Sequence, residues 1–213
     1  MNYDLSQIRR EYAQKSLSKK EVYNDPIEQL QLWLDEAVQA DTIEPTAMTL
    51  STADKKGRVT SRVVLLKELK ATGLVFYTNY NSLKGKQLFA NPFAAGLFYW
   101  PELERQVRVE GITEKLSSGE SDQYFNSRPE SSKIGTWASD QSNEIPDRKY
   151  LEKSFFKMKK KFKENKVIRP PHWGGYIIQP DRFEFWQGRE NRLHDRIEYS
   201  LQQENWTIKR LAP

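Results

Sequence analysis

The chain has 213 residues, 37% of them hydrophobic and 12% aromatic, which is enough material for one buried core. It contains no cysteine, so disulfides and thiolate metal sites are excluded, and its net charge of +5 indicates anionic partners. No apolar signal core opens the chain and no apolar run approaches membrane-spanning length. We therefore expect a cytoplasmic protein without a membrane segment.

The first 25 residues are polar and charged, and we interpret them as an arm that precedes a single domain over residues 26–213. Asp25-Pro26 predicts a helix start, because Asp caps a helix and Pro suits its first turn. The buried stripe of this helix is predicted to be Ile27, Leu30, Leu34 and Ala37.

Most of the remaining chain reads as short strands separated by turn signals such as Asp54-Lys55-Lys56-Gly57. The predicted strands are 48–53, 59–67, 74–78, 93–100, 107–114, 176–178, 183–186, 192–200 and 206–210. Many short strands with tight turns predict a mainly β (α+β) fold, built as an antiparallel barrel or sandwich.

Three helices are predicted between the strands. Residues 82–90 form a short one, and Ser117 with Glu120 is a possible capping box for the next. Residues 147–163 form the longest, whose apolar stripe at Leu151, Phe155, Met158 and Phe162 favours a core contact.

A run of lysines around the longest helix raises the possibility of a nucleic-acid site. Its members are Lys157, Lys159, Lys160, Lys161, Lys163 and Lys166. Nucleic-acid sites usually interleave stacking aromatics with basic residues, whereas Phe155 and Phe162 lie on the apolar stripe. We favour a solvated helix face and expect no nucleic-acid partner.

The sequence lacks the motifs of metal sites, nucleotide-binding loops and catalytic nucleophiles. His172 and His194 are far apart without metal-ligand spacing, so no metal site is expected. No glycine-rich dinucleotide loop, Walker loop or nucleophile elbow occurs.

One charged row stands out near the C-terminus. If residues 192–200 are a strand, Arg192, His194 and Arg196 line one face. Two cations and an imidazole on one face repel each other unless an anion lies between them. A merely solvated basic face is the alternative.

A second set of cations stands at strand ends and at a helix start. Arg62 and Lys67 flank the apolar run 63–66, and Ser82 with Lys84 begins a helix after Tyr77-Thr78. A helix N-terminus with hydroxyls and a lysine nearby is a plausible phosphate seat.

Another oxyanion site is possible further along the chain. Tyr124, Arg128 and Ser132 share a face if their helix continues through Pro129, which proline disfavours.

An ordered set of motifs spans most of the chain. In chain order they are Arg62-Val63-Val64-Leu65-Leu66-Lys67, Phe76-Tyr77-Thr78-Asn79, Glu104-Arg105-Gln106-Val107, Tyr124-Phe125-X-Ser127-Arg128-Pro129, Gln141-Ser142, Phe185-Trp186-Gln187-Gly188 and Arg192-Leu193-His194-Asp195-Arg196. This set resembles the pyridoxamine (pyridoxine) 5′-phosphate oxidase family, from about Arg9 to the terminal Arg210-Leu211-Ala212-Pro213.

The resemblance implies a split β-barrel that binds flavin mononucleotide (FMN), in a homodimer with the flavin sites between subunits. It implies oxidation of pyridoxine or pyridoxamine 5′-phosphate to pyridoxal 5′-phosphate, with oxygen reduced to hydrogen peroxide. A redox step carried by the flavin needs neither a nucleophile nor a metal in the protein.

The resemblance also implies roles for individual residues. The cofactor set is Arg62, Val63, Val64, Leu65, Leu66, Lys67, Tyr77, Thr78, Lys84, Gln106, Gln141, Ser142, Trp186 and Arg196. The substrate set is Lys67, Tyr124, Arg128, Ser132, Arg192, Leu193 and His194, with Arg9, Arg10, Glu11 and Tyr12 in an arm that closes over the substrate. Arg192 and His194 are the expected catalytic residues.

Two positions depart from the family pattern. Leu83 stands where a basic residue is common, and Glu44 where aspartate is usual. A flavin-binding relative with another substrate, such as a reductase, is the alternative function. The phosphopyridine interpretation alone requires five residues together, namely Tyr124, Arg128, Ser132, Arg192 and His194.

Overall fold

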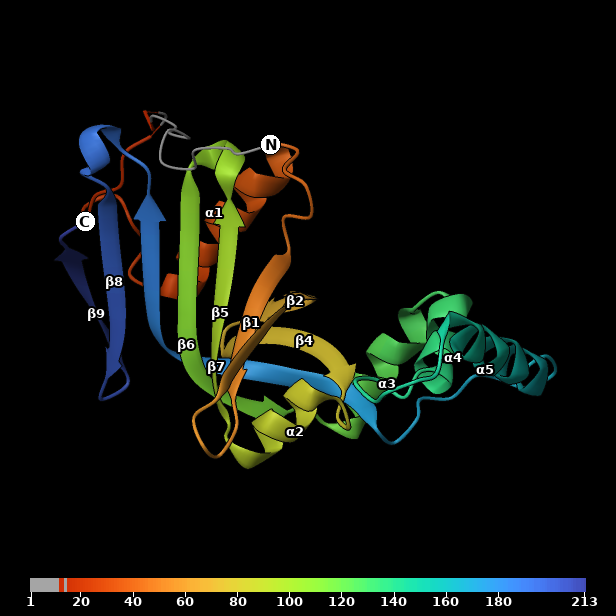
Figure 1. Cartoon of the computed structure of the whole chain (residues 1–213). Coiled ribbons are helices and arrows are strands. Elements are labelled where there is room, and N and C mark those ends of the chain that lie inside the picture. Colours follow the sequence, from red (N-terminus) through yellow and green to blue (C-terminus); the bar gives the residue numbers. More distant parts are fainter. Residues whose placement is uncertain (1–11, 14) are drawn as a thin grey trace, which may run out of the picture.

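The computed structural model describes residues 12–13 and 15–213, in which nine antiparallel strands form one sheet that curls into a half-barrel (Figure 1). The strands are β1 (Ala47–Ala53), β2 (Val59–Leu65), β3 (Glu68–Lys70), β4 (Gly73–Asn79), β5 (Phe93–Trp100), β6 (Arg105–Lys115), β7 (Trp173–Gln187), β8 (Asp195–Gln202) and β9 (Asn205–Leu211). Their order is β2-β1-β5-β6-β7-β4-β3, with β8 paired to β7 and β9 paired to β8. The predicted mainly β, antiparallel α+β fold is confirmed.

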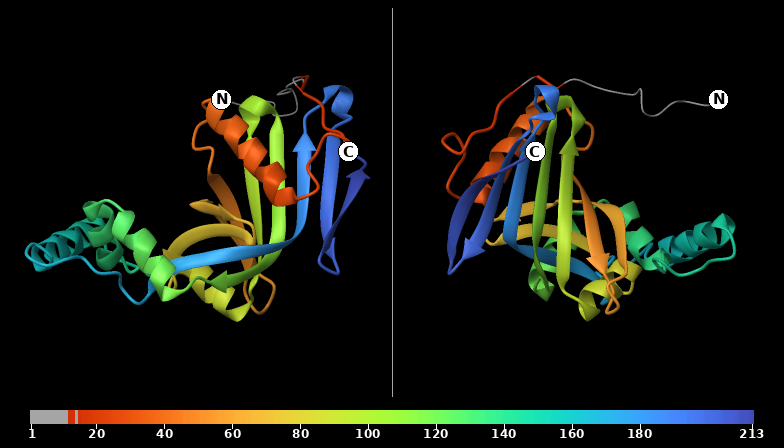
Figure 2. Two further views of the ribbon diagram at one scale, coloured as in Figure 1. Left: turned by 180° about the vertical axis from the view of Figure 1, so that it is seen from behind. Right: turned by 60° about the vertical axis from the view of Figure 1, so that its left-hand side comes forward.

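One helix closes the inner face of the sheet. It is α1 (Pro26–Gln39), capped by the Asp25 side chain, which accepts from the Ile27 N–H at 2.8 Å. Leu30, Leu34 and Ala37 are buried as predicted, and Trp33 packs edge-on against Phe185 with ring centroids 5.2 Å apart. Figure 2 shows α1 lying across the strands, where it completes the main core.

Four further helices lie at the other end of the sheet. They are α2 (Leu83–Ala90), α3 (Ser118–Ser127), α4 (Glu130–Ala138) and α5 (Arg148–Lys161). The last two project away from the sheet and share a smaller core around Phe125, Ile134 and Phe162. Phe155 and Met158 of α5 pack against this core, so the predicted core contact of the stripe is confirmed.

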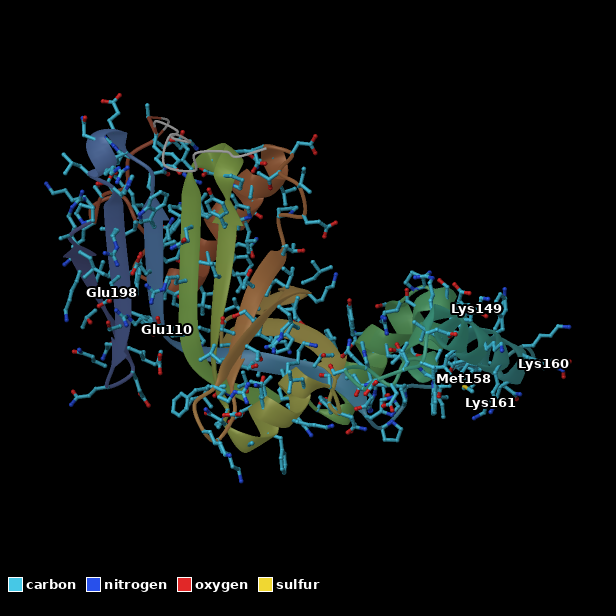
Figure 3. The ribbon with its side chains drawn as sticks, viewed as in Figure 1. Glu110, Lys149, Met158, Lys160, Lys161 and Glu198 are labelled. Atoms are coloured by element: carbon cyan, nitrogen blue, oxygen red, sulfur yellow. The ribbon has the colours of Figure 1, made fainter. Side chains whose placement is uncertain are left out.

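Helix α5 carries exposed lysines, among them Lys149, Lys160 and Lys161, far from Glu110 and Glu198 on the sheet (Figure 3). Among the residues that the structure describes, no helix is long and apolar enough to cross a membrane.

The prediction of separate strands at 176–178 and 183–186 was wrong, because both belong to the single 15-residue strand β7. Pro180 does not break the strand, since it sits where the β6–β7 register shifts between Glu110 and Gly111. A side chain at Gly111 would lie only 2.8 Å from the Pro180 Cα, so glycine is needed at this bend. The bend divides β7 into a half that pairs with β4 and a half that pairs with β8.

The predicted strand 192–200 was wrong at its start. Pairing of β7 with β8 begins at Gln187↔Asp195, and Glu190–Arg192 is a 3-10 turn in which Asn191 and Arg192 have φ of 55° and 62°. An antiparallel hairpin needs a turn between its strands, and this segment supplies it. Arg192 and His194 therefore do not alternate on a strand face with Arg196.

Candidate functional site

A cavity of about 510 Å³ is lined by strands β2 and β4 and by helices α3 and α4. The predicted residues that line it are Val63, Val64, Leu65, Lys67, Tyr77, Thr78, Lys84, Tyr124, Arg128, Ser132 and Gln141. The cavity thus brings together the ends of β2 and β4, the start of α2, and helices α3 and α4.

Two cations beside the cavity have no acidic partner in the part of the chain that the structure describes. Lys84 Nζ donates to Thr78 Oγ1 at 3.2 Å, and Arg62 donates to Thr52 Oγ1 at 2.6 Å and Thr60 Oγ1 at 2.5 Å. Among the described residues, no carboxylate lies within ion-pair distance of either.

The environment of these cations disfavours their charge. Burial lowers the pKa of Lys84, the charge of Arg62 lowers it further, and burial lowers the pKa of Arg62. A bound anion would relieve both effects, so this end of the cavity suits a phosphate.

An aromatic wall forms another side of the cavity. Tyr77 stacks on Tyr124 with ring centroids 3.8 Å apart and on Trp173 at 5.4 Å. Burial is the main cause that raises the pKa of Tyr77 to about 12, so its hydroxyl stays protonated at neutral pH. Flat rings of this kind suit a planar aromatic ligand.

Arg128 lies against this wall. Its guanidinium sits 4.7 Å from the Trp173 ring centroid and donates to Thr136 Oγ1 at 2.8 Å. Burial lowers the pKa of Arg128. The helix does end before Pro129, yet Ser132 at the start of α4 still lines the cavity with Tyr124 and Arg128.

The other predicted residues gather at the far end of β7. Gln106 pairs with Trp186 across β6 and β7, and Trp186 pairs with Arg196 across β7 and β8. Trp186 lies at the end of the bent strand β7, thirteen residues from Trp173 at its start, and Figure 1 shows the two ends of this strand at opposite ends of the sheet. Within one copy of the chain the sheet therefore separates this group from the cavity.

His194 is packed in that second group. Its ring lies 4.6 Å from Trp186 and 5.7 Å from Tyr12, and its Nδ1 accepts from the Arg189 N–H at 3.1 Å. The bond at Nδ1 places the proton of the neutral imidazole on Nε2, which can then donate. Partial burial lowers the pKa of His194, and the Arg192 charge adds to this, while Asp195 opposes it.

The residues on either side of His194 in the chain have different environments. Arg192 and Leu193 are exposed in the turn before β8. Arg196 is already paired, because its Nε and one terminal nitrogen donate to the buried Glu184 at 3.1 and 2.8 Å.

Some predicted residues do not reach the cavity. The Leu66 side chain is in the main core, and Ser142 lines an adjacent cavity of about 480 Å³ that also contains Gln141. Arg9, Arg10 and Glu11 lie outside the described residues.

Sequence reasoning missed Trp173, Asn79, Gly135, Thr136 and Ser139, which also line the cavity. For Trp173 the available signal was its position directly before Gly174-Gly175 at the start of a strand. A side chain on Gly175 would lie 2.9 Å from the Tyr77 ring, so this glycine lets the strand approach the aromatic wall.

Two family models match the chain. Residues 34–162 match the family described as pyridoxamine 5′-phosphate oxidase, and residues 173–213 match the pyridoxine 5′-phosphate oxidase C-terminal dimerisation region.

Full-length relatives carry related names. A pyridoxine/pyridoxamine 5′-phosphate oxidase of Cyanothece sp. (strain PCC 7425 / ATCC 29141) is 47% identical over 213 residues and all of both chains. A protein of the same name from Actinobacillus succinogenes is 53% identical over 210 residues, covering 99% of this chain and 100% of the relative.

Solved structures agree at the level of fold. PhzG from Burkholderia lata 383, solved with tetrahydrophenazine-1-carboxylic acid, has a TM-score of 0.87 and 32% identity over 91% of this chain and 95% of its own. An FMN-binding, pyridoxamine 5′-phosphate oxidase-related protein from Nostoc punctiforme has a TM-score of 0.67 and 18% identity, covering 93% of this chain and 100% of its own. The predicted split β-barrel is confirmed.

Proposed function

This chain belongs to the pyridoxine/pyridoxamine 5′-phosphate oxidase family, and from that premise we propose that its active site forms between two copies of the chain. The enzyme oxidises pyridoxine 5′-phosphate and pyridoxamine 5′-phosphate to pyridoxal 5′-phosphate with FMN as cofactor, and oxygen is reduced to hydrogen peroxide. The match of residues 173–213 to a dimerisation region supports a homodimer.

The observation that carries the proposal is the position of the two residue groups on one exposed sheet face. Strand pairing puts Val63, Leu97 and Glu184 in one row across the sheet, by way of Thr49 and Arg108. Side chains in such a row point the same way. The cavity residue Val63 and the far group around Trp186 thus share this outer face.

This face is apolar where it is most exposed. Val63 is 64% exposed, Phe93 60% and Tyr99 54%. A second copy packed on this face through a twofold axis buries them in a self-complementary contact. The same contact brings the Trp186–His194 group of one copy toward the cavity of the other.

The residues present fit the cofactor. Arg62 and Lys84 have no acidic partner among residues 12–13 and 15–213, and Thr78 adds a hydroxyl. No dinucleotide-binding loop is present in the sequence. In the proposed site these residues hold the FMN phosphate, while residues 63–65 and Gln141 line the space beside it. Bound FMN supplies the two-electron acceptor.

Substrate is held by the second anion site in this proposal. Lys67, Arg128 and Ser132 bind the substrate phosphate, and the Tyr124 ring lies beside the pyridine. His194 donates from Nε2 to the substrate, and Arg192 orients it through its fixed donor fork. A cavity closed by a second copy excludes water from the reacting carbon.

Mixed dimers test the shared site. Lys67→Ala removes a cavity residue and Arg192→Ala removes a residue of the far group, so each homodimer should lose most of its activity. In a mixed dimer with shared sites, one site carries both changes and the other is wild type. Random reassociation should therefore restore about a quarter of wild-type turnover.

The matched control mixes Lys67→Ala with Lys84→Ala, two cavity variants that leave every shared site defective. Absence of recovery in the Lys67→Ala/Arg192→Ala mixture, with mixed dimers verified by mass, would show that each site is built from one copy.

A further inference from the structure

The described end of the N-terminal arm is attached to the sheet beside His194. The Tyr12 ring meets Trp186 edge-on, with ring centroids 5.8 Å apart, and meets His194 in the same way at 5.7 Å. The Ala13 N–H donates to Glu104 Oε2 at 3.0 Å. Tyr12 thus covers two residues of the proposed active site.

Gly188 is the residue under Tyr12. A Cβ at this position would lie 2.8 Å from Tyr12 Cγ and 2.9 Å from both Cβ and Cδ1, and these are its three nearest atoms. Its φ lies outside the left-handed region, so the backbone itself accepts alanine. Glycine at position 188 is therefore explained by the space that the Tyr12 ring occupies, and not by a turn in the backbone.

A separate clamp holds the arm five residues later. Asp195 Oδ2 accepts from the Leu17 N–H at 3.0 Å, and Arg210 donates to the Leu17 carbonyl at 3.2 Å. Asp195 and Arg210 also form an ion pair with each other, and Leu17 is buried in the main core. The arm thus has one attachment at Leu17 that does not depend on Gly188.

We propose that Gly188 is a positioning residue of the oxidase: it leaves the space in which Tyr12 packs on Trp186 and His194, while the Asp195–Arg210 clamp keeps the arm within reach. The inference rests on the proposed function for its effect on catalysis. The docking of Tyr12 itself is a separate property of the chain.

A double-mutant cycle on the FMN-loaded enzyme tests the proposal. Gly188→Ala should raise KM for pyridoxine 5′-phosphate by up to about tenfold, the scale of a lost aromatic contact, with kcat changed less than about twofold. Tyr12→Ala should have a similar effect. The double variant should match Tyr12→Ala alone, because the added methyl group then has nothing to displace.

Gly119→Ala is the matched control. Gly119 lies in α3, and its added Cβ would meet a single atom, Ser117 Oγ, at 4.0 Å. It should leave KM unchanged.

Amide hydrogen exchange of the same proteins gives a readout independent of turnover. Gly188→Ala should speed exchange at Ala13 by about fivefold or more and leave Leu17 protected by its clamp. Additive KM effects in the double variant, or unchanged exchange at Ala13, would overturn the proposal. If the wild-type protein forms no pyridoxal phosphate, the proposed function fails, and the exchange experiment still decides whether Gly188 seats Tyr12.

Discussion

At the scale of single residues, the cations near the cavity and the cation of the Trp186 group have different environments. Arg196 is neutralised by the buried Glu184, and its pKa is raised chiefly by that hydrogen bond. Lys84 and Arg62 have no such partner among the residues that the structure describes, and burial lowers their pKa values. The unpaired cations are therefore the ones arranged to receive an anion.

Lys84→Ala should raise the FMN dissociation constant by about tenfold or more, since a charge-assisted contact contributes about 1.5–3 kcal/mol. Flavin titration of the apoprotein measures the effect. Lys86→Ala, two residues along the same helix and exposed, is the matched control. Unchanged affinity for Lys84→Ala would show that the phosphate is held elsewhere.

His194 should impose a pH dependence on substrate binding. Its pKa is lowered by partial burial and by Arg192, so the ring is neutral at pH 7 with its donor at Nε2. Protonation adds a proton at Nδ1, so this atom can no longer accept from the Arg189 N–H and two donors face each other. KM should therefore rise as pH falls through a pKa below the ordinary 6.5.

His194→Gln keeps a donor without a titrating ring, so comparing its pH profile with that of wild type separates the imidazole from the substrate phosphate, which itself ionises near pH 6. Identical profiles for both proteins would exclude His194 as the titrating group.

At the scale of elements, the N-terminus of α3 links the cavity wall to the sheet. Ser117 and Glu120 form the predicted capping box, with both reciprocal hydrogen bonds present. Glu120 also pairs with Lys70 of β3 at 2.5 Å. Because α3 carries Tyr124, this cap helps hold the aromatic wall in place.

Ser117→Ala should lower the free energy of unfolding by about 1 kcal/mol, the usual cost of removing a serine cap. Denaturant unfolding measures it. Ser118→Ala, exposed at the next position, should change stability much less. Equal effects of the two variants would mean that the capping box does not stabilise the helix.

At the scale of the whole molecule, α5 projects away from the sheet and its lysines are exposed (Figure 3). Lys149 and Lys160 lie on the opposite side of the helix from its apolar stripe, whereas Lys161 lies over the Trp137 and Phe162 rings. Phe156 and Tyr150 of α5, which are 66% and 54% exposed, are aromatics that the sequence interpretation did not consider. Six residues apart on a helix, the two rings point about 120° away from each other, so they do not form a row of stacking platforms. The expectation of a solvated face stays a prediction.

Purified enzyme should show no tight binding to single- or double-stranded nucleic acid at physiological salt. Replacing Lys157, Lys159 and Lys160 by glutamate should leave oxidase activity unchanged, because these exposed residues lie outside the cavity. Submicromolar affinity that this charge reversal abolishes would identify α5 as a nucleic-acid site.

Local patterns predicted most of the elements. The Asp25-Pro26 helix start, the Ser117–Glu120 cap and the strands around residues 48–53 and 93–100 depend on neighbouring residues, and all were found. The errors came where tertiary pairing overrides a local signal. Pro180 reads as a strand break, but β6 accommodates it at a bulge, and Arg192 reads as a strand residue, but the β7–β8 hairpin requires a turn there.

The sequence by itself determined the residue types of the site and, through the order of its motifs, the family and its chemistry. Only the tertiary structure decided how those residues divide: a cationic cavity at one end of β7, and the Trp186–His194 group at the other. Spacing along the chain specifies the face of a strand on which a residue lies, because that depends on the backbone repeat. Which distant faces meet depends on how the sheet bends and pairs, and that is a property of the folded chain as a whole.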